Sequence, residues 1–303
     1  MAGLSARASQ VGDSHGCLDL VGLSPLMART SGRPEISIGL IDGPIAVDHP
    51  DLPAKNIHEL PGQLPGACLD DGSTACAHGT FIAGVLLARR GSVAPAICPG
   101  CSLFARPIFT EAIPDGEVIP GATAEELADA IIEVINAGAR IINLSLALQG
   151  SSSKGESSLE QALDHALRRG VVIIAAAGNQ GAVGSSAITR HPWIIPVVAY
   201  DRRGHPMDIS NLGASIGRRG LGAPGEAITS LGAITEPVTM GGTSAATPFV
   251  TGALALMWSE FPGASAAQVR SAVTQAAAPR RGSIVPPLLN AWAGYQAISK
   301  ARS

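Results

Sequence analysis

Charged and aromatic residues are scarce in this chain of 303 residues, at 15% and 3%, whereas 46% of its residues are hydrophobic. A chain this apolar has ample material for a large core, which excludes a mostly disordered protein. The low aromatic content predicts a core built from Ala, Val, Ile and Leu. The length fits a single domain over residues 1–303.

Basic stretches and long apolar segments are also missing. The net charge is -3 and no basic run interleaves with aromatics, which argues against a nucleic-acid partner. Apolar windows such as 171–177 are too short to span a bilayer, and residues 1–34 show no secretory signal. We therefore expect a cytoplasmic monomer with no membrane partner, no cofactor and no metal.

The five cysteines do not form an obvious framework. They are Cys17, Cys68, Cys76, Cys98 and Cys101, and an odd number leaves at least one thiol over unless it pairs between chains. The Cys98–Cys101 pair has C-x-x-C spacing. Structural thiols, a local disulfide, a redox pair and half of a zinc site with Cys68 and Cys76 all remain open.

Apolar strands alternate with amphipathic helices along most of the chain. Capping boxes mark helix starts at Thr123, Ser157 and Ser265. This alternation is typical of a mostly parallel sheet with helices on both faces, a three-layer α/β fold. Buried strands are predicted at residues 36–41, 103–109, 140–146, 171–177 and 194–199.

Other segments give weaker signals. Before the core of residues 35–303, we expect an irregular arm over residues 1–34 that contains one short helix. Residues 44–76 are rich in Pro, Gly and Asp and predict loops, after which His78 opens a helix. Short strands are expected at 228–231 and 238–240, and closing helices at 244–260, from 265, and at 289–301.

The stretch Gly241–Pro248 is small, uncharged and rich in glycine. Because proline is tolerated in a helix only near its first turn, Pro248 predicts that Ser244 lies at a helix start. Free N–H groups at such a position stabilise nearby negative charge, which suits a nucleophile. A serine there also serves as an ordinary N-cap, so the stretch alone does not decide between the two.

Three upstream residues change that balance. Asp42 ends one predicted strand, Asn179 follows another, and His78 is expected at a helix start. Ligands and catalytic groups gather at the carboxyl ends of parallel strands, where all four residues would meet. A carboxylate, an imidazole, a hydroxyl and an amide donor are the parts needed for nucleophilic acyl transfer.

Each member of the set has a chemical role in that reaction. Ser244 would attack a peptide carbonyl, and His78 would accept its proton and pass it to the leaving amine. Asp42 would fix the histidine tautomer. The Asn179 amide and the Ser244 N–H would donate to the oxyanion. Taken singly, each residue has a structural explanation, as a turn, helix-start or left-handed residue.

The ordered set resembles the subtilisin-like serine proteases. The resemblance rests on Asp42, His78-Gly79-Thr80, Ala177-Gly178-Asn179 and Gly242-Thr243-Ser244-x-Ala246-x-Pro248, and extends from residue 36 to the end. It implies endopeptidase activity through the roles above. It also implies that Ser145, Leu146 and Ala147 pair with the substrate as an added strand. Ala176, Ala177 and Gly178 would line the pocket for the residue before the cut.

The chain departs from most of that family at several places. Gly43-Pro44 follows Asp42 where relatives have Ser or Thr and then Gly, and Ala147-Leu148 replaces frequent glycines. Only 35 residues precede the first strand, too few for the usual folding propeptide, and no calcium-binding loop can be matched. Bulkier side chains at residues 147–148 would narrow the substrate groove.

A finer likeness is to the proteases that mature cyanobactin peptides. It is carried by Asp42-Gly43-Pro44 with a following His-Pro pair, a cysteine shortly before His78, and Pro-Gly-Cys before the next strand. One branch removes a leader, and another macrocyclises the core peptide and carries an insertion between the Asp and His blocks. Only 36 positions separate Asp42 from His78, which favours hydrolysis of a precursor peptide.

Other classes fit the sequence less well. A peptide-binding module that keeps the fold without catalysis would not need four intact polar groups. A nucleotide-binding enzyme is disfavoured because the glycines after residue 177 do not form G-x-G-x-x-G and no P-loop lysine occurs. An α/β-hydrolase would place its nucleophile in G-x-S-x-G and before the histidine, and this chain does neither.

Overall fold

The computed structural model describes residues 16–60, 62, 64–109, 111, 122–146, 153–276 and 282–302. Seven strands form one wholly parallel sheet in the order β2-β3-β1-β4-β5-β6-β7. A two-stranded antiparallel hairpin, β8–β9, lies apart from it. The strands are β1 (Ser37–Asp42), β2 (Ile57–Glu59), β3 (Ser102–Pro107), β4 (Ile141–Leu144), β5 (Val172–Ala176), β6 (Ile195–Tyr200), β7 (Leu221–Pro224), β8 (Ile228–Ser230) and β9 (Val238–Met240).

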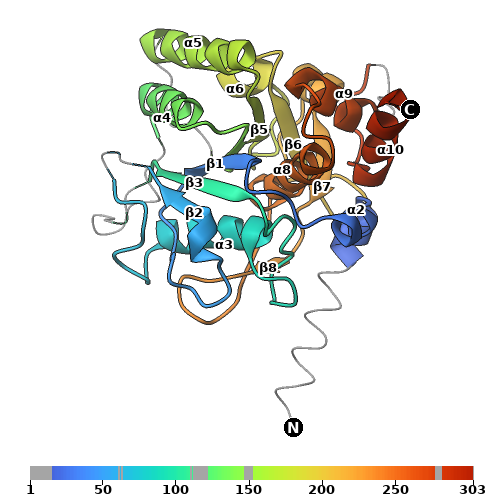
Figure 1. The fold of residues 1–303 in the computed structure, drawn as a ribbon. Coiled ribbons are helices and arrows are strands. Elements are labelled where there is room, and N and C mark those ends of the chain that lie inside the picture. Colours follow the sequence, from blue (N-terminus) through green and yellow to red (C-terminus); the bar gives the residue numbers. More distant parts are fainter. Residues whose placement is uncertain are drawn as a thin grey trace.

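Helices cover both faces of the sheet, and Figure 1 shows α4 and α5 on the side opposite α3. The fold prediction of a mostly parallel sheet between two helical layers is confirmed. The helices are α2 (Ser24–Arg29), α3 (Thr74–Leu87), α4 (Ala124–Asn136), α5 (Ser153–Arg169), α6 (Ala187–Arg190), α7 (Ala214–Arg219), α8 (Thr243–Glu260), α9 (Ala266–Ala276) and α10 (Ala291–Arg302), with a 3₁₀ turn η1 (Ala54–Asn56).

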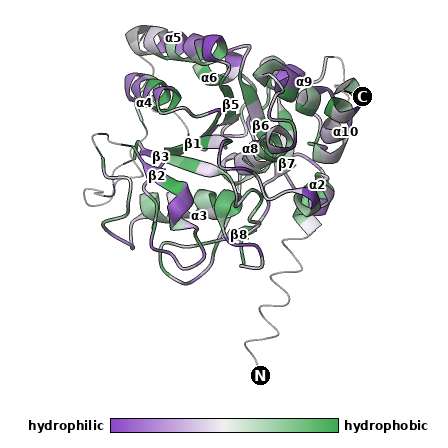
Figure 2. Ribbon diagram, in the orientation of Figure 1, coloured by the Kyte–Doolittle hydropathy of each residue, from purple (hydrophilic) through white to green (hydrophobic). Residues whose placement is uncertain are grey.

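Alternate residues of each central strand enter the cores on opposite faces. In β5, Val172 and Ile174 belong to the core around α3 and α8, whereas Ile173 and Ala175 belong to the core under α4 and α5. Because a strand's side chains point alternately to its two sides, burial on both explains why the sequence runs apolar without a break. In Figure 2 the central strands β1 and β5 are largely hydrophobic, whereas α4 and α5 also carry hydrophilic residues.

Within residues 16–34 the structure has more helix than the expected irregular arm with one short helix. Residues 16–20 are helical and α2 follows them. Leu18, Leu23 and Leu26 are buried in the same core as α8. The first fifteen residues lie outside the described part of the chain. The apolar pattern of this segment is too short to predict a helix by itself. Packing against the core stabilises these short helices instead.

Several short elements in the Gly- and Pro-rich segments were not predicted. The edge strand β2 lies within the stretch expected to form loops, and β7 reads Leu-Gly-Ala-Pro, a composition that argues against a strand. Both pair in parallel with a neighbour that is already in place. Their backbone conformation is therefore decided by the sheet more than by their own residues.

Candidate active site

The candidate residues lie where the chain changes direction within the sheet. After β1 the chain adds β2 and β3 on one side and then β4 and β5 on the other, so the switch point falls between β1 and β4. Ile41 pairs with Leu144, which places Asp42 level with Ser145 at the carboxyl edge. Parallel α/β sheets bind their ligands in the crevice at such a point.

Asp42 and His78 form a close pair. His78 Nδ1 lies 2.6 Å from Asp42 Oδ1, and the same oxygen accepts a hydrogen bond of 2.7 Å from the Gly43 N–H. The Asp42 side chain is fully buried and that of His78 is 22% exposed. A carboxylate can only accept, so Nδ1 carries the proton and Nε2 is left as the basic nitrogen.

The position of His78 in its helix differs from the sequence prediction. Helix α3 begins at Thr74, and Ser73 caps it by accepting a hydrogen bond from the Cys76 N–H. His78 therefore lies one turn inside the helix instead of opening it. The apolar spacing used to predict the start begins only at Phe81, and the alanines before it favour a helix without marking where it begins.

Two opposing effects act on the pKa of His78. Burial disfavours the imidazolium and lowers the pKa, whereas the charge of Asp42 and its hydrogen bond raise it. The net effect is a pKa raised above the ordinary value of 6.5. The imidazolium that forms when a base takes a proton is thus stabilised by the carboxylate beside it.

Ser244 is the second residue of α8, as Pro248 predicted. Gly242, the residue before α8, has φ +95°, a left-handed conformation that glycine adopts without strain. The Ser244 carbonyl accepts a 3.0 Å hydrogen bond from Ser145 Oγ, which ties the helix start to the end of β4. Within the described residues no hydrogen bond joins the His78 and Ser244 side chains, and such bonds commonly tighten only when substrate binds.

Thr243 holds Asn179 in a defined orientation. Asn179 Oδ1 accepts hydrogen bonds from the Thr243 N–H at 2.8 Å and from Thr243 Oγ1 at 3.0 Å. A backbone N–H can only donate, so the atom facing it must be the oxygen, and the Asn179 NH₂ group points elsewhere. Thr243 is part of a sequence motif, but the motif does not predict this role, because the contact spans 64 positions.

The residues expected to bind substrate differ in how deeply they are buried. Ser145, Leu146 and Ala177 are buried, while Ala176 and Gly178 are half-buried. Ala147 lies outside the described residues. Gly178 has φ +103°, and an added Cβ would meet the Asn211 side chain at 2.4 Å, so glycine is needed there on both grounds.

Sequence reasoning missed Asn211, which fixes the segment after β5. Its Oδ1 accepts hydrogen bonds from the N–H groups of Gln180 and Ala182. Its Nδ2 donates to the Ala177 carbonyl at 3.2 Å. An isolated asparagine among residues 200–240 offers no local signal, because its partners lie about thirty positions away.

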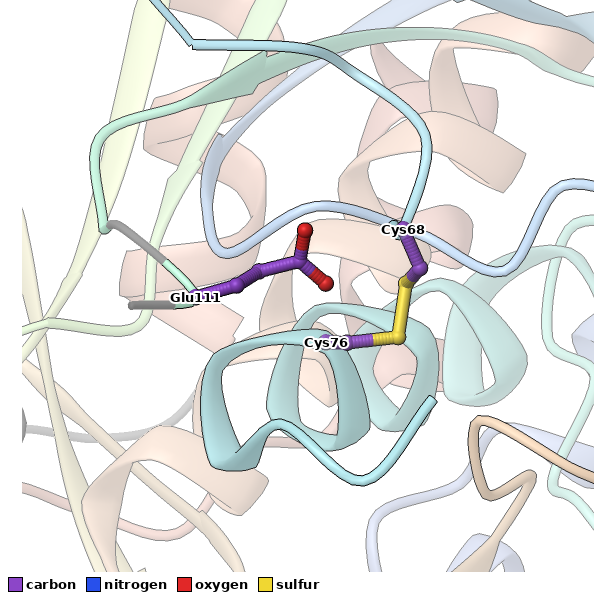
Figure 3. A group of neighbouring side chains, drawn as sticks. All are labelled: Cys68, Cys76 and Glu111. Carbon is purple, nitrogen blue, oxygen red and sulfur yellow. A yellow bond between two sulfur atoms is a disulfide. The ribbon is translucent and has the colours of Figure 1, made fainter. Parts of the chain in front are cut away.

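A disulfide joins Cys68 to Cys76, two positions before His78 (Figure 3). Glu111 lies beside it and accepts hydrogen bonds from the N–H groups of Leu69 and Asp70. These three side chains are grouped closely enough for a metal ion, but both sulfurs are bonded to each other and cannot act as thiolate ligands. Cys98 and Cys101 are buried free thiols elsewhere, so no site combines the two cysteine pairs.

A cleft of about 380 Å³ lies next to the Asp42 end of β1. The disulfide-linked loop forms one wall of it, and the exposed Leu69 lies on the rim. The cleft is lined by Pro44, Leu64, Pro65, Leu69, Asp70, Phe109 and Glu111.

Among the described helices, none is both long enough and apolar enough to cross a bilayer.

The geometry of the site defines a class of enzyme. A parallel α/β sheet carries a buried carboxylate–imidazole pair at its switch point, with a serine at an adjacent helix start. These are the parts of a serine hydrolase whose residues follow the chain order Asp, His, Ser.

The chain belongs to the subtilase family, whose model (Peptidase_S8, Subtilase family) matches residues 33–295. It is 33% identical over 238 residues to Subtilisin Savinase from Lederbergia lenta, covering 78% of this chain and 81% of that protein. The family resemblance and the prediction of a serine peptidase are therefore confirmed.

Two solved structures carry the finer likeness. A serine-to-alanine mutant of the protease domain of PatA is 31% identical, with a TM-score of 0.79 over 89% of this chain and 97% of that one. The prenylagaramide maturation protease PagA is 27% identical, with a TM-score of 0.77 over 91% and 98%. The suspected closeness to peptide-maturation proteases is supported.

Proposed function

We propose that this serine peptidase is an endopeptidase that cuts through an acyl-enzyme formed on Ser244. His78 Nε2 takes the serine proton and returns it to the leaving amine, while Asp42 holds the imidazole and stabilises its charged form. The observation that carries the proposal is the 2.6 Å pair of Asp42 and His78 at the edge where α8 begins.

Two donors are available for the oxyanion. The Asn179 NH₂ group is turned away from Thr243, which occupies its oxygen, and the Ser244 N–H lies in the first turn of α8. Donors of this kind are fixed before the reaction and stabilise charge as it develops. The loss of one costs about 2.7–4 kcal/mol in a related enzyme.

The substrate is proposed to bind as an extended peptide. The backbone of Ser145, Leu146 and Ala147 would pair with it beside β4, and Ala176, Ala177 and Gly178 would surround the side chain before the cut. The hydrogen bonds of Asn211 to the segment after β5 support this, because they hold that wall in place without substrate.

Labelling with a fluorophosphonate probe tests the nucleophile. The native protein should be labelled under conditions that label other serine hydrolases, and Ser244→Ala should not be. A protein that folds but resists the probe would instead support a peptide-binding module that has kept only the fold.

The proposed substrate is a ribosomally made precursor peptide. Support comes from the likeness to PagA, named as a maturation protease, and from the short interval of 36 residues between Asp42 and His78. Mass spectrometry of products from a proteome-derived peptide library would show the preferred cut. Linear fragments are expected, whereas cyclic products would identify a macrocyclase.

The remaining features of the proposal concern the molecule as a whole. We infer one catalytic domain over residues 1–303 that acts in the cytoplasm, as a monomer and without a cofactor. Light scattering on the purified protein tests whether it is a monomer. The Cys68–Cys76 disulfide counts against that location, because cytoplasmic thiols are kept reduced. Rapid thiol alkylation in cells should modify both cysteines if the location is cytoplasmic, and neither if it is oxidising.

A further inference from the structure

Buried polar side chains connect the middle of α8 back to its first turn through β4. Thr251 Oγ1 donates to Asn143 Oδ1 at 2.8 Å, and Asn143 Nδ2 donates to Ser145 Oγ at 2.9 Å. Ser145 Oγ then donates to the Ser244 carbonyl at 3.0 Å. The first two residues are fully buried and Ser145 is 2% exposed, so each group depends on this chain for its partners.

This series of hydrogen bonds ends on the Ser244 carbonyl, which has no backbone donor within its own helix. In a regular helix the N–H of residue 248 would bond to the carbonyl of Ser244, but that residue is Pro248, which has no N–H. Ser145 supplies the missing bond from a neighbouring strand. The Ser244 carbonyl is thus held by the residue that follows β4 and not by its own helix.

The two ends of this series of hydrogen bonds orient it together. The Ser244 carbonyl can only accept, so Ser145 donates its proton there and accepts from the Asn143 NH₂ group. Asn143 Oδ1 is then left facing Thr251, whose hydroxyl donates to it. Without the Thr251 hydroxyl this buried oxygen loses its donor, and the Asn143 amide loses the bond that holds it against Ser145.

We propose that Thr251 and Asn143 are positioning residues for the nucleophile, acting on Ser244 through Ser145. The inference rests on the proposed role of Ser244. Thr251 lies seven positions, about 10 Å, further along α8, so its effect is transmitted through the hydrogen bonds. A nucleophile held less firmly reacts more slowly with a substrate that binds equally well.

The variant Thr251→Val tests the inference, because valine keeps the shape and removes the hydroxyl. We expect kcat and the second-order rate of fluorophosphonate labelling to fall between about tenfold and a hundredfold, with KM changed less than about twofold. Thr251→Ser restores the hydroxyl and should restore both rates. If the valine variant does not fold, Thr251→Ala removes the same hydroxyl with less bulk.

A matched control is Ser259→Ala, which removes another fully buried hydroxyl from α8, about 22 Å beyond Ser244. Its Oγ bonds to the Ala255 carbonyl and accepts from the Arg33 N–H, so its loss should lower Tm without changing kcat. The inference is overturned if Thr251→Val lowers only Tm, or if Ser259→Ala slows the reaction as much. Failure of the native protein to react with the probe would overturn the proposed function itself, and with it this role.

Discussion

At the scale of single residues, the site depends on the buried carboxylate of Asp42 and on the two groups that bond to it. Asp42 is fully buried, and its Oδ2 has no hydrogen-bond partner among the described residues. Its stabilisation comes from His78 and the Gly43 N–H, both on Oδ1. A carboxylate so placed acts strongly on the imidazole, because a buried environment screens their attraction less than water would.

The raised pKa of His78 predicts the pH dependence of activity. Only the neutral imidazole can accept the serine proton, so kcat/KM should fall as the pH drops, with a midpoint above about 6.5. The contribution of the pair to folding has the opposite trend. It is fully present below pH ~6.5, the pKa in the unfolded chain, and is lost as the pH rises through the raised pKa. A pH–rate profile and urea unfolding across that range measure both.

Asp42→Asn is the control for this pH dependence. Without the carboxylate, burial alone acts on His78, so the pKa should move below its ordinary value, and the rate should drop about 10⁴-fold. A flat profile from neutral to strongly acid pH, or an unchanged midpoint in the variant, would contradict the role of His78 as the base.

At the scale of elements, α3 joins the site to the disulfide-linked loop. Cys76 lies in its first turn and His78 follows on the next, so the loop around Cys68 is covalently attached close to the base. The same loop is held by Glu111 and by hydrogen bonds that Ile45 exchanges with Gly66 and Cys68. One wall of the cleft therefore depends on how firmly this loop is attached.

Replacing both cysteines, as Cys68→Ser with Cys76→Ser, should lower the free energy of unfolding. The sulfurs close a loop with a sequence separation of 8, for which loop-closure entropy predicts about 2–3 kcal/mol. Thermal melts of the native protein with and without dithiothreitol should show the same loss in the free energy of unfolding. A loss of stability when reductant is added to the double variant would show that another bond is responsible.

At the scale of the whole molecule, the sheet and its outer helices fit through small residues. Gly39 lies in the middle of β1, and an added Cβ would come 2.0 Å from Cγ1 of Val134 in α4. Valine is branched and has few rotamers in a helix, so it cannot easily move aside. The close contact between the central strand and α4 is possible because residue 39 has no side chain.

Gly39→Ala should therefore destabilise the protein by about 1–3 kcal/mol in urea unfolding. Gly184→Ala is the control, since its Cβ would have no neighbour within 4 Å. Combining Gly39→Ala with Val134→Ala should cost less than the sum of the two single changes, because the overlap is removed. Strict additivity would show that the contact with Val134 is not the cause.

The sequence by itself determined the layers of the fold and predicted which residues form the site. Unbroken apolar strands such as β5 predicted a sheet buried on both faces, and Pro248 predicted the start of α8. Polar residues at strand ends and a helix start then predicted Asp42, Asn179 and Ser244 as members of the site. These signals are local, because backbone periodicity and capping are decided by residues a few positions apart.

Only the tertiary structure decided how those residues are held. The orientation of the Asn179 amide depends on Thr243, 64 positions away, and the Ser244 carbonyl depends on Ser145, 99 positions away. The pairing of Cys68 with Cys76 and the strands β2 and β7 were likewise not decided by local pattern. Contacts of this kind follow from the order in which strands join the sheet, and residue spacing along the chain carries no record of that order.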